Sequence, residues 1–162
     1  MATFSNSPLK VHFIGVGGIG ISALARWFLA ENWAVTGSDA AKSQITQDLK
    51  KDGLKAKIGH RTSNLPRDAN LVVKSTAIPD SNPEIRAALN SGLGVLTYPE
   101  ALGRLTKTYD TIAVSGSHGK STTTALASLV LMAANEDPTV IIGTKLKEFG
   151  DKNFRSGKSD WL

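Results

Sequence analysis

The sequence predicts an α/β fold, with a Rossmann-like open parallel sheet domain followed by the start of a P-loop ATP-binding domain. Two observations lead to this prediction. Short apolar, β-branched runs alternate with helix-forming stretches four or five times before Thr108. In addition, two glycine-rich loops, which begin at Gly15 and Gly116, each lie between an apolar run and a helix-forming run. We therefore expect a flexible tail over residues 1–8, a first domain over 9–107 and an incomplete second domain over 108–162.

The first predicted unit is a βαβ unit. An apolar strand over Val11–Val16 leads into GxGxxG, formed by Gly15, Gly17 and Gly20, with Gly18 as an extra glycine. The following helix, over residues 21–32, carries its apolar residues at the i, i+3, i+4 spacing of a face that packs on a sheet. A second strand over residues 34–37 ends at Ser38 and Asp39. This order is typical of a doubly wound fold.

The segment up to residue 107 continues the alternation. One helix is capped by Asn82 and has Pro83 in its first turn, which fits capping preference. The other elements are assigned from apolar periodicity and from glycine or proline stops. We expect helices over residues 43–52, 83–91 and 99–107, and strands over residues 55–58, 71–73 and 94–97.

Ligands of an open parallel sheet bind at the carboxyl ends of its strands. Small and polar residues follow the predicted strands there, namely Gly17 to Gly20, Ser38, Asp39, His60, Ser75, Thr76 and Tyr98. GxGxxG alone does not separate a nicotinamide dinucleotide from another diphosphate such as a UDP-sugar, because the same backbone amides accept either. Asp39 suits a ribose contact in such folds, and the alternative is a turn residue or helix cap after a strand.

The second glycine loop is the stretch on which the functional interpretation depends. A predicted strand over Ile112–Val114 leads into GSHGKS, and a helix over residues 122–134 follows. Glycine-loop amides and a helix N-terminus bind phosphates, a lysine such as Lys120 reaches the outer phosphates, and a hydroxyl such as that of Ser121 holds Mg²⁺. The pattern is GxxGKS and not the full Walker A sequence, because Val114 stands where its first glycine would be. The alternative is a glycine turn with a solvated lysine.

The remainder of the chain does not complete a second domain. The helix over residues 122–134 is almost wholly apolar, so we expect other elements to cover it on most sides. A strand over 139–142 follows, then a polar, turn-like segment over 144–159 and the first residues of another strand at 160–162. We expect the chain to be a piece of a longer enzyme, and its uncovered apolar surface to favour self-association.

Composition narrows the classes of function. The chain has 162 residues, 41% of them hydrophobic and 20% charged, with a formal net charge of +5 and no cysteine. Disulfides and cysteine chemistry are excluded. No apolar run suggests a membrane span, and the N-terminus does not resemble a secretory signal, so we expect a cytoplasmic protein. Acidic residues are interspersed among the lysines, which argues against a nucleic-acid surface.

Four motifs, in this order and at these spacings, resemble the Mur ligases. They are HFIGVGGIGISALA from His12, VTGSD from Val35, STAIPDSNPEI from Ser75 and AVSGSHGKSTTTA from Ala113. The likeness covers residues 11–143. Ser117 and Ser121 stand where the family usually has threonines, which keeps both hydroxyls. In the family, the acidic Mg²⁺ ligands and the C-terminal domain lie downstream of the region that these motifs cover, and this sequence ends before both.

The resemblance implies an ATP- and Mg²⁺-dependent amide ligase of peptidoglycan synthesis. The carboxylate of UDP-N-acetylmuramate would be activated as an acyl phosphate and then joined to L-alanine. By this resemblance, Lys120 would act in catalysis and Ser121 would bind Mg²⁺. The implied ATP-binding residues are Gly116, Ser117, His118, Gly119, Lys120, Ser121 and Thr122. The implied UDP-sugar-binding residues are Gly17, Gly18, Ile19, Gly20, Ser38, Asp39, His60, Ser75 and Thr76.

The three histidines have different expected roles. His118 lies inside the second loop, where it either contacts phosphate or substrate or is a bystander. His60 at a strand end is either a substrate contact or a loop histidine. His12, on the first strand, points away from its neighbours Val11 and Phe13 and is expected to be structural.

Two alternatives to the L-alanine ligase remain open. A ligase that attaches a recycled murein tripeptide to the same sugar shares the fold and the nucleotide. A non-catalytic module that senses NAD(P) or another nucleotide would use only the first loop, and both Asp39 and Tyr98 are compatible with it.

Overall fold

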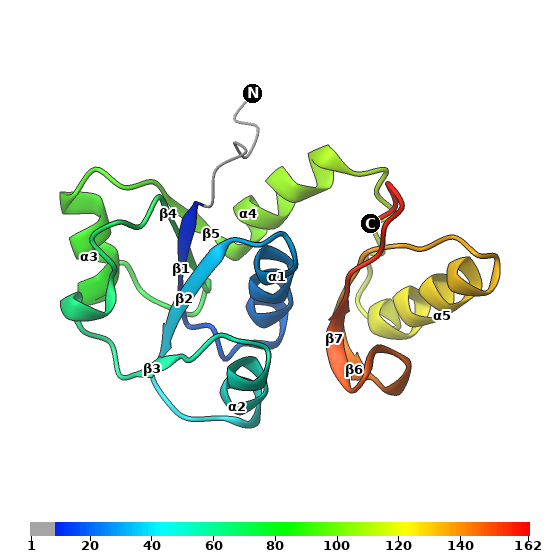
Figure 1. Cartoon of the computed structure of the whole chain (residues 1–162), viewed down its shortest axis with the longest axis horizontal. Helices are drawn as coiled ribbons and strands as arrows, with labels where there is room; N and C mark the ends of the chain where they lie inside the picture. Colours follow the sequence, from blue (N-terminus) through cyan, green and yellow to red (C-terminus); the bar gives the residue numbers. More distant parts are fainter. Residues whose placement is uncertain (1–8) are drawn as a thin grey trace. The chain divides into compact units, whose positions relative to one another are not determined.

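The computed structural model describes residues 9–162. The tail predicted over residues 1–8 lies outside the described residues. The chain forms two compact units, one up to Tyr98 and one from Pro99 to Leu162, which are described separately (Figure 1). Within the described residues, no helix is long and apolar enough to cross a membrane. The exact domain limits stay a prediction.

The first unit is built on a five-stranded sheet in the order β3-β2-β1-β4-β5, and every neighbouring pair is parallel. This arrangement confirms the predicted Rossmann-like sheet. Its strands are β1 (Lys10–Ile14), β2 (Ala34–Asp39), β3 (Lys57–Ile58), β4 (Leu71–Lys74) and β5 (Val95–Thr97).

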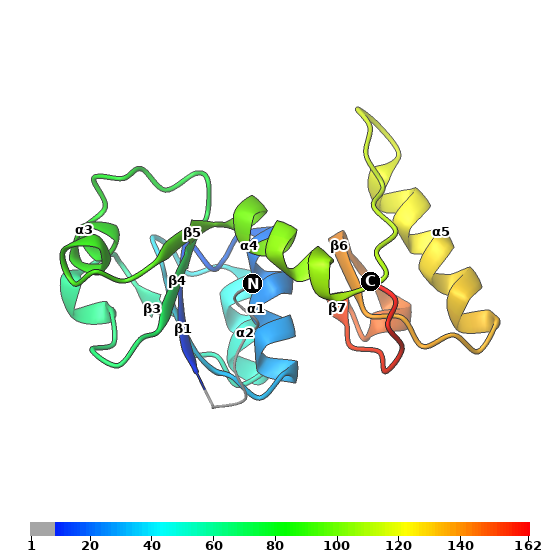
Figure 2. The same cartoon turned by 90° about the horizontal axis from the view of Figure 1, so that it is seen from above.

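Helices cover both faces of this sheet. The helices α1 (Ile19–Ala30) and α2 (Gln44–Lys51) lie on one face, and α3 (Pro83–Asn90) lies on the other (Figure 2). The short 3₁₀ helix η1 (Thr62–Asn64) follows β3 and packs on α3. The predicted Asn82 cap is confirmed, because its Oδ1 accepts the Glu84 N–H at 2.9 Å.

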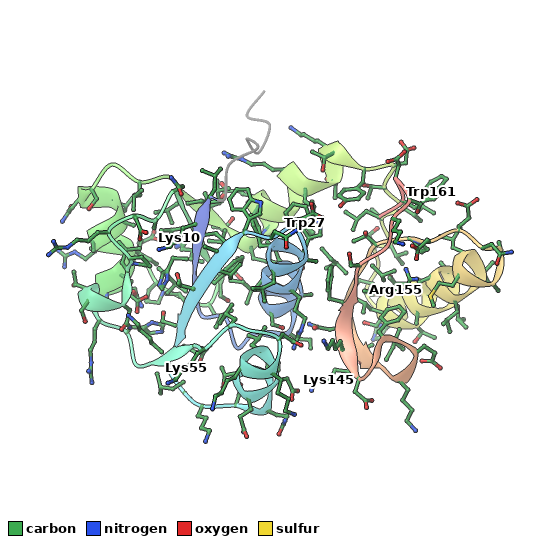
Figure 3. All side chains as sticks on the ribbon, in the orientation of Figure 1. Lys10, Trp27, Lys55, Lys145, Arg155 and Trp161 are labelled. Atoms are coloured by element: carbon green, nitrogen blue, oxygen red, sulfur yellow. The ribbon has the colours of Figure 1, made fainter. Side chains whose placement is uncertain are left out.

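The central strand β1 divides the core between the two faces. Side chains alternate along a strand, so Phe13 faces α1, where its ring meets that of Phe28 edge to face at 5.7 Å. Trp27, labelled in Figure 3, and Trp33 pack on Phe28 in the same way, at 4.9 Å and 4.8 Å. Ile14 faces α3, in a cluster with Val72, Ile85 and Ala88. The residue between Phe13 and Val11, His12, therefore points towards α3 as well.

The second unit combines helices with an antiparallel hairpin. It contains α4 (Tyr98–Leu105, which begins at the last residue of the first unit), η2 (Thr106–Thr108), α5 (Lys120–Ala133), β6 (Val140–Leu146), η3 (Lys147–Phe149) and β7 (Lys152–Arg155). Val140, Ile142 and Phe149 form its buried cluster, against which Ala125 and Met132 of α5 pack.

Two expectations for this unit were wrong. The strand over Ile112–Val114 does not form, because its pairing is limited to an isolated parallel bridge between Asp110 and Trp161 and a bond from Ile112 N to Leu162 O. The polar segment over 144–159 is not merely turn-like. It supplies most of the β6–β7 hairpin, because the buried residues Phe149, Asn153 and Phe154 anchor it despite the charged residues between them.

Candidate functional site

The first glycine loop runs from β1 to α1 at the carboxyl end of the sheet. Gly15 has φ +79°, and a Cβ there would lie 3.0 Å from both Ser75 Cβ and Ile78 Cγ1, so only glycine fits. Ser75, which follows β4, therefore lies directly against the loop, and the exposed Thr76 comes next in the chain. The structure thus brings Ser75 to the loop at the point where the strand order reverses, between β1 and β4.

Asp39 is a direct partner of the same loop. Its Oδ2 accepts the Gly17 N–H at 2.8 Å, and its Oδ1 accepts the Ala41 N–H at 3.1 Å. A Cβ on Gly17 would lie 2.8 Å from Asp39 Oδ2 and 3.3 Å from Ser43 Oγ. The carboxylate at the end of β2 therefore holds the loop in place, and it puts a negative charge beside the Gly17 amide.

The backbone amides of the four predicted loop residues, Gly17 to Gly20, are not equally available to a ligand. The Gly17 amide is bonded to Asp39, and the Gly18 amide donates to Gly15 O at 3.3 Å. Ser22 N donates to Gly18 O at 3.0 Å, which begins the hydrogen bonding of α1. A helix leaves the N–H groups of its first turn without intrahelical acceptors, and its dipole makes that end positive. An anion at this loop would therefore be held mainly by the first turn of α1, which includes Ile19 and Gly20.

Tyr98 lies over this first turn. A Cβ on Gly20 would come within 2.9 Å of Tyr98 Cζ and 3.0 Å of its hydroxyl oxygen. Burial raises the pKa of the Tyr98 phenol, so the hydroxyl stays protonated and can donate. The tyrosine that follows β5 thus lies against the first turn of α1. Open parallel sheets bind ligands in a crevice at this end, and we use the word crevice for the carboxyl end of the sheet at the first glycine loop, Ser75 and Tyr98.

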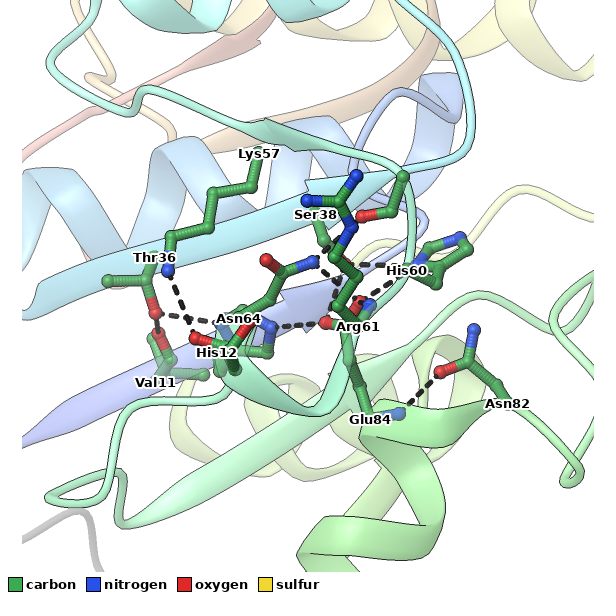
Figure 4. Close-up of polar contacts among 12 residues, drawn as sticks. Val11, His12, Thr36, Ser38, Lys57, His60, Arg61, Asn64, Asn82 and Glu84 are labelled. Atoms are coloured by element: carbon green, nitrogen blue, oxygen red, sulfur yellow. Dashed lines mark hydrogen bonds and ion pairs between the residues drawn. The ribbon is translucent and has the colours of Figure 1, made fainter.

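Behind the crevice, a buried carboxylate gathers polar groups from four elements (Figure 4). Glu84, in the first turn of α3, is fully buried. Its Oε2 accepts hydrogen bonds from His12 Nε2 at 2.8 Å and Ser38 Oγ at 2.7 Å. Its Oε1 lies within hydrogen-bond distance of His60 Nδ1 at 3.0 Å, Asn64 Nδ2 at 3.1 Å and Arg61 N at 3.2 Å.

These contacts keep Glu84 ionised. Burial alone would raise the pKa of this carboxyl, but hydrogen bonds from His12, Ser38, Asn64 and His60 outweigh burial and lower it to about 2. The expected structural role of His12 agrees with its geometry, because its ring is fully buried between Glu84 and Thr36 Oγ1, which is 2.9 Å from Nδ1. Ser38 is also fully buried, so it lies beneath the crevice and supports it.

Sequence reasoning did not identify Glu84 as part of the site. It lies within the STAIPDSNPEI motif, and its place in the first turn of a helix suits the helix dipole without indicating a further role. A signal was available, because Glu84 and Ala88 are four residues apart and so share the face of α3 that carries the buried Ile85. A carboxylate on a buried helix face requires several hydrogen-bond donors around it. The position of Glu84 in the sequence could therefore have indicated a polar cluster here.

The second glycine loop is exposed throughout Gly116–Gly119, and α5 begins directly after it. Lys120 Nζ donates to Gly116 O at 2.6 Å, so the lysine folds back over the loop. Ser121 Oγ lies 3.4 Å from where a Cβ on Gly143 would be, which places β6 beside the start of α5. Thr122 and His118 are exposed. The predicted ATP residues therefore surround one exposed helix N-terminus.

Comparison with known proteins gives a consistent result. A family model described as "Mur ligase family, catalytic domain" matches residues 10–110. UDP-N-acetylmuramate–L-alanine ligase of Aquifex aeolicus is 45% identical over 153 residues, which are 94% of this chain and 33% of the relative. The corresponding protein of Lachnospira eligens is 40% identical over 158 residues, which are 97% of this chain and 34% of the relative. The chain spans about a third of the length of these curated relatives.

Solved structures agree with the sequence relatives. UDP-N-acetylmuramate-alanine ligase MurC from Thermotoga maritima is 32% identical, with a TM-score of 0.89, over 94% of this chain and 36% of that one. A murein peptide ligase from Psychrobacter arcticus is 26% identical, with a TM-score of 0.84, over 93% of this chain and 34% of that one. The family model covers well over half of the chain, and the motifs that resemble the family lie on the glycine loops and crevice described above. The chain belongs to the Mur ligase family.

Proposed function

We propose that the chain is the nucleotide-sugar-binding part, with the ATP loop, of a ligase that joins L-alanine to UDP-N-acetylmuramate. The observation that carries this proposal is the presence of two glycine loops, each at an accessible helix N-terminus, in a chain of the Mur ligase family. The names of the curated relatives support the choice of sugar and amino acid. ATP and UDP-sugars are cytoplasmic metabolites, so the proposal includes a cytoplasmic location.

The first loop would hold the UDP diphosphate. Its anion-binding groups are the first-turn amides of α1, at Ile19 and Gly20, with Ser75 and Thr76 alongside. The Asp39 carboxylate already accepts the Gly17 N–H, so that amide is not available to the diphosphate. The carboxylate would face the ligand as an acceptor, which suits a hydroxyl of the ribose or sugar. His60, held by Glu84, is the other proposed contact to the uridine or sugar.

The second loop would hold ATP. Backbone amides of Gly116 to Thr122 would cradle the phosphates. Lys120 would leave the Gly116 carbonyl to neutralise charge on the transferred phosphoryl group, a task that is mostly electrostatic. A carboxylate oxygen of the sugar would take the γ-phosphoryl group and release ADP. The amine of L-alanine would then attack the acyl carbon and release inorganic phosphate and a proton.

Mg²⁺ would supply charge neutralisation at the phosphates. The Ser121 hydroxyl fits such an ion, because Mg²⁺ prefers oxygen ligands and completes its shell with phosphates and water. Within the described residues, no group of three or more histidine, aspartate or glutamate side chains could hold a metal. Ser121 is the Mg²⁺ ligand that the second loop would supply. We also propose that the chain, which spans about a third of the length of its curated relatives, binds the UDP-sugar but does not turn over alone.

Calorimetric titration with UDP-N-acetylmuramate and with ATP–Mg²⁺ tests the proposal. We expect the chain to bind the sugar nucleotide, and a Lys120→Ala change to weaken ATP binding while leaving sugar binding intact. Circular dichroism would first establish that each variant is folded. No binding of UDP-N-acetylmuramate at millimolar concentration by the folded chain would contradict the proposal.

Two alternatives are distinguished by further measurements. A recycling ligase, which the fold shared with the Psychrobacter arcticus protein keeps open, would use the same sugar with a peptide in place of L-alanine. Assays of a longer protein that contains this chain, with L-alanine and with the tripeptide, would separate the two. An NAD(P)-sensing module would instead show NADH fluorescence on binding, and that signal would be unchanged by Lys120→Ala.

A further inference from the structure

The hydrogen bonds of Glu84 fix more than the position of His60. We propose that Glu84 is a positioning residue that holds His60 with its proton on Nδ1, so that His60 Nε2 accepts a hydrogen bond from a hydroxyl or imide N–H group of the uridine. This inference rests on the proposed function, because it specifies which part of the nucleotide-sugar one side chain recognises.

The proton on Nδ1 follows from the two groups that face it. Glu84 Oε1, 3.0 Å away, belongs to an ionised carboxylate and can only accept. Ser38 Oγ is 3.2 Å from Nδ1, and it gives its own proton to Glu84 Oε2 at 2.7 Å. Both neighbours therefore present lone pairs to Nδ1. In the neutral ring, the other nitrogen, Nε2, then carries a lone pair.

His60 Nε2 is the unsatisfied atom of this cluster. It is buried and has no hydrogen-bond partner within the described part of the chain, although the side chain as a whole remains 15% exposed. Buried polar atoms nearly always have partners, so an orphan acceptor at the carboxyl end of a parallel sheet indicates a group that a ligand supplies. His60 follows β3 by two residues, at the carboxyl end of the sheet where such folds bind their ligands.

The loop that carries His60 is fixed on the same carboxylate. Arg61 N and Asn64 Nδ2 also donate to Glu84 Oε1, at 3.2 Å and 3.1 Å. Asn64 Nδ2 donates to Gly59 O as well, at 2.7 Å. Figure 4 shows His60, Arg61 and Asn64 gathered around the Glu84 side chain. Loss of the carboxylate would therefore free both the ring and the loop from Gly59 to Asn64.

The chemistry of an acceptor limits what His60 can recognise. Phosphate oxygens are acceptors too, so a neutral His60 Nε2 would repel the diphosphate, which is left to the first turn of α1. The uridine offers suitable donors in its ribose hydroxyls and in the N3–H of uracil. These two sources share the same chemistry, and ligand analogues can separate them.

The ligand part of the test compares UDP with analogues that each lack one donor, namely 2′-deoxy-UDP, 3′-deoxy-UDP and N3-methyl-UDP. We expect one analogue to bind about tenfold or more weakly than UDP, as for a lost hydrogen bond of about 1.4 kcal/mol. In His60→Phe, which cannot accept, that analogue should bind as well as UDP does. Equal binding of all four nucleotides by the unmodified chain, or the absence of any analogue whose discrimination is lost in His60→Phe, would overturn the inference.

The positioning part of the test reads the ring directly. Long-range ¹H–¹⁵N correlation spectra distinguish the two neutral forms of a histidine, and we expect the Nδ1–H form for His60. In Glu84→Gln that form should no longer dominate, and uridine discrimination should fall. Asp52→Asn is the matched control, because Asp52 pairs with Arg26 at 2.7 Å, away from this cluster, so its loss should leave the His60 signal unchanged.

Failure of this inference is separable from failure of the proposed function. If the folded chain binds no UDP compound at all, the proposed function fails. If it binds UDP while His60 shows the Nε2–H form, the inference fails and the proposed function stands. Should Glu84→Gln not fold, the analogue series on the unmodified chain and on His60→Phe still decides the question.

Discussion

His12 Nε2 on β1 donates to Glu84 Oε2 on α3 at 2.8 Å, and both side chains are fully buried. This bond joins the central strand to the helix on one face of the sheet. Because Glu84 also holds Ser38 and His60, the same carboxylate connects β1, β2 and the residues that follow β3. The packing of the sheet and the geometry of the crevice therefore depend on one ionised group.

The first prediction concerns acid stability. The pKa of Glu84 is about 2 in the folded chain against an ordinary 4.5, so its ionised form stabilises the fold. This contribution, on the order of 3 kcal/mol in total, is fully present above pH 4.5 and is lost as the pH falls towards 2. Urea titrations at several pH values would measure it.

Glu84→Gln should remove most of this pH dependence. The variant should be less stable at neutral pH, because a neutral amide replaces a carboxylate that five donors approach, and its stability should change little between pH 4.5 and 2 beyond what other groups contribute. Asp68→Asn is a suitable comparison, since Asp68 is a surface partner of Lys10. An equally steep acid dependence in Glu84→Gln and the unmodified chain would contradict the prediction.

The second prediction concerns Gly20 and Tyr98. Alanine in place of glycine within a helix normally stabilises by up to about 1 kcal/mol. Here the added Cβ would lie 2.9 Å from Tyr98 Cζ, so Gly20→Ala should destabilise the first unit by about 1–3 kcal/mol. In a Tyr98→Ala background the ring is absent, and the same substitution should become neutral or stabilising. A double-mutant cycle in urea would show this change of sign, and additive effects would argue against the contact.

Much of the first unit could be predicted from the sequence because its signals are local. GxGxxG after an apolar run, Asn82 before Pro83 and the glycine stops each act within a few residues. The order of the five strands then follows from the doubly wound pattern. The Asp39–Gly17 bond and the Glu84 cluster could not be predicted in this way, because their partners lie 20 to 72 residues apart in the chain.

The second unit was predicted less well for a related reason. The apolar start of β6 was predicted as a strand, but the hairpin continues through a charged, polar stretch in which alternation is weak, and its buried contacts there come from Phe149 and Phe154 on separate elements. The stretch over Ile112–Val114 reads as a strand by propensity. It is not one here because a strand also needs a neighbour along its length, and only a short segment near Trp161 pairs with it.

The third prediction concerns Gly157, which follows β7. A Cβ there would lie 1.9 Å from Asp137 O and 2.4 Å from Pro138 O. The segment cannot move aside cheaply, because the Gly157 N–H donates to Thr139 Oγ1 at 3.1 Å and Arg155 Nη1 to Pro138 O at 2.6 Å. Gly157→Ala should therefore destabilise the second unit by about 3 kcal/mol, near the top of the range for overpacking.

Gly103→Ala is the matched control for this substitution. Gly103 lies within α4, and an added Cβ there meets no atom within 4 Å, so alanine should stabilise by up to about 1 kcal/mol. Thermal unfolding followed by circular dichroism would compare the two variants. If both shift the midpoint in the same direction, the close contact at Gly157 does not have the proposed effect.

The fourth prediction concerns the exposed apolar face of α5. Leu126 and Val130 lie four residues apart on this helix and are 60% and 66% exposed, and Ile112 is 49% exposed. Large apolar side chains gathered on one exposed helix face favour association with another apolar surface. We expect the chain to self-associate with increasing concentration, and the double substitution Leu126→Glu, Val130→Glu to reduce this self-association.

Leu89→Glu, at a 56% exposed leucine on α3, is the control and should have little effect. Light scattering at several concentrations measures the mass directly. A constant monomeric mass for the unmodified chain, or an equal reduction by Leu89→Glu, would show that α5 is not the associating surface.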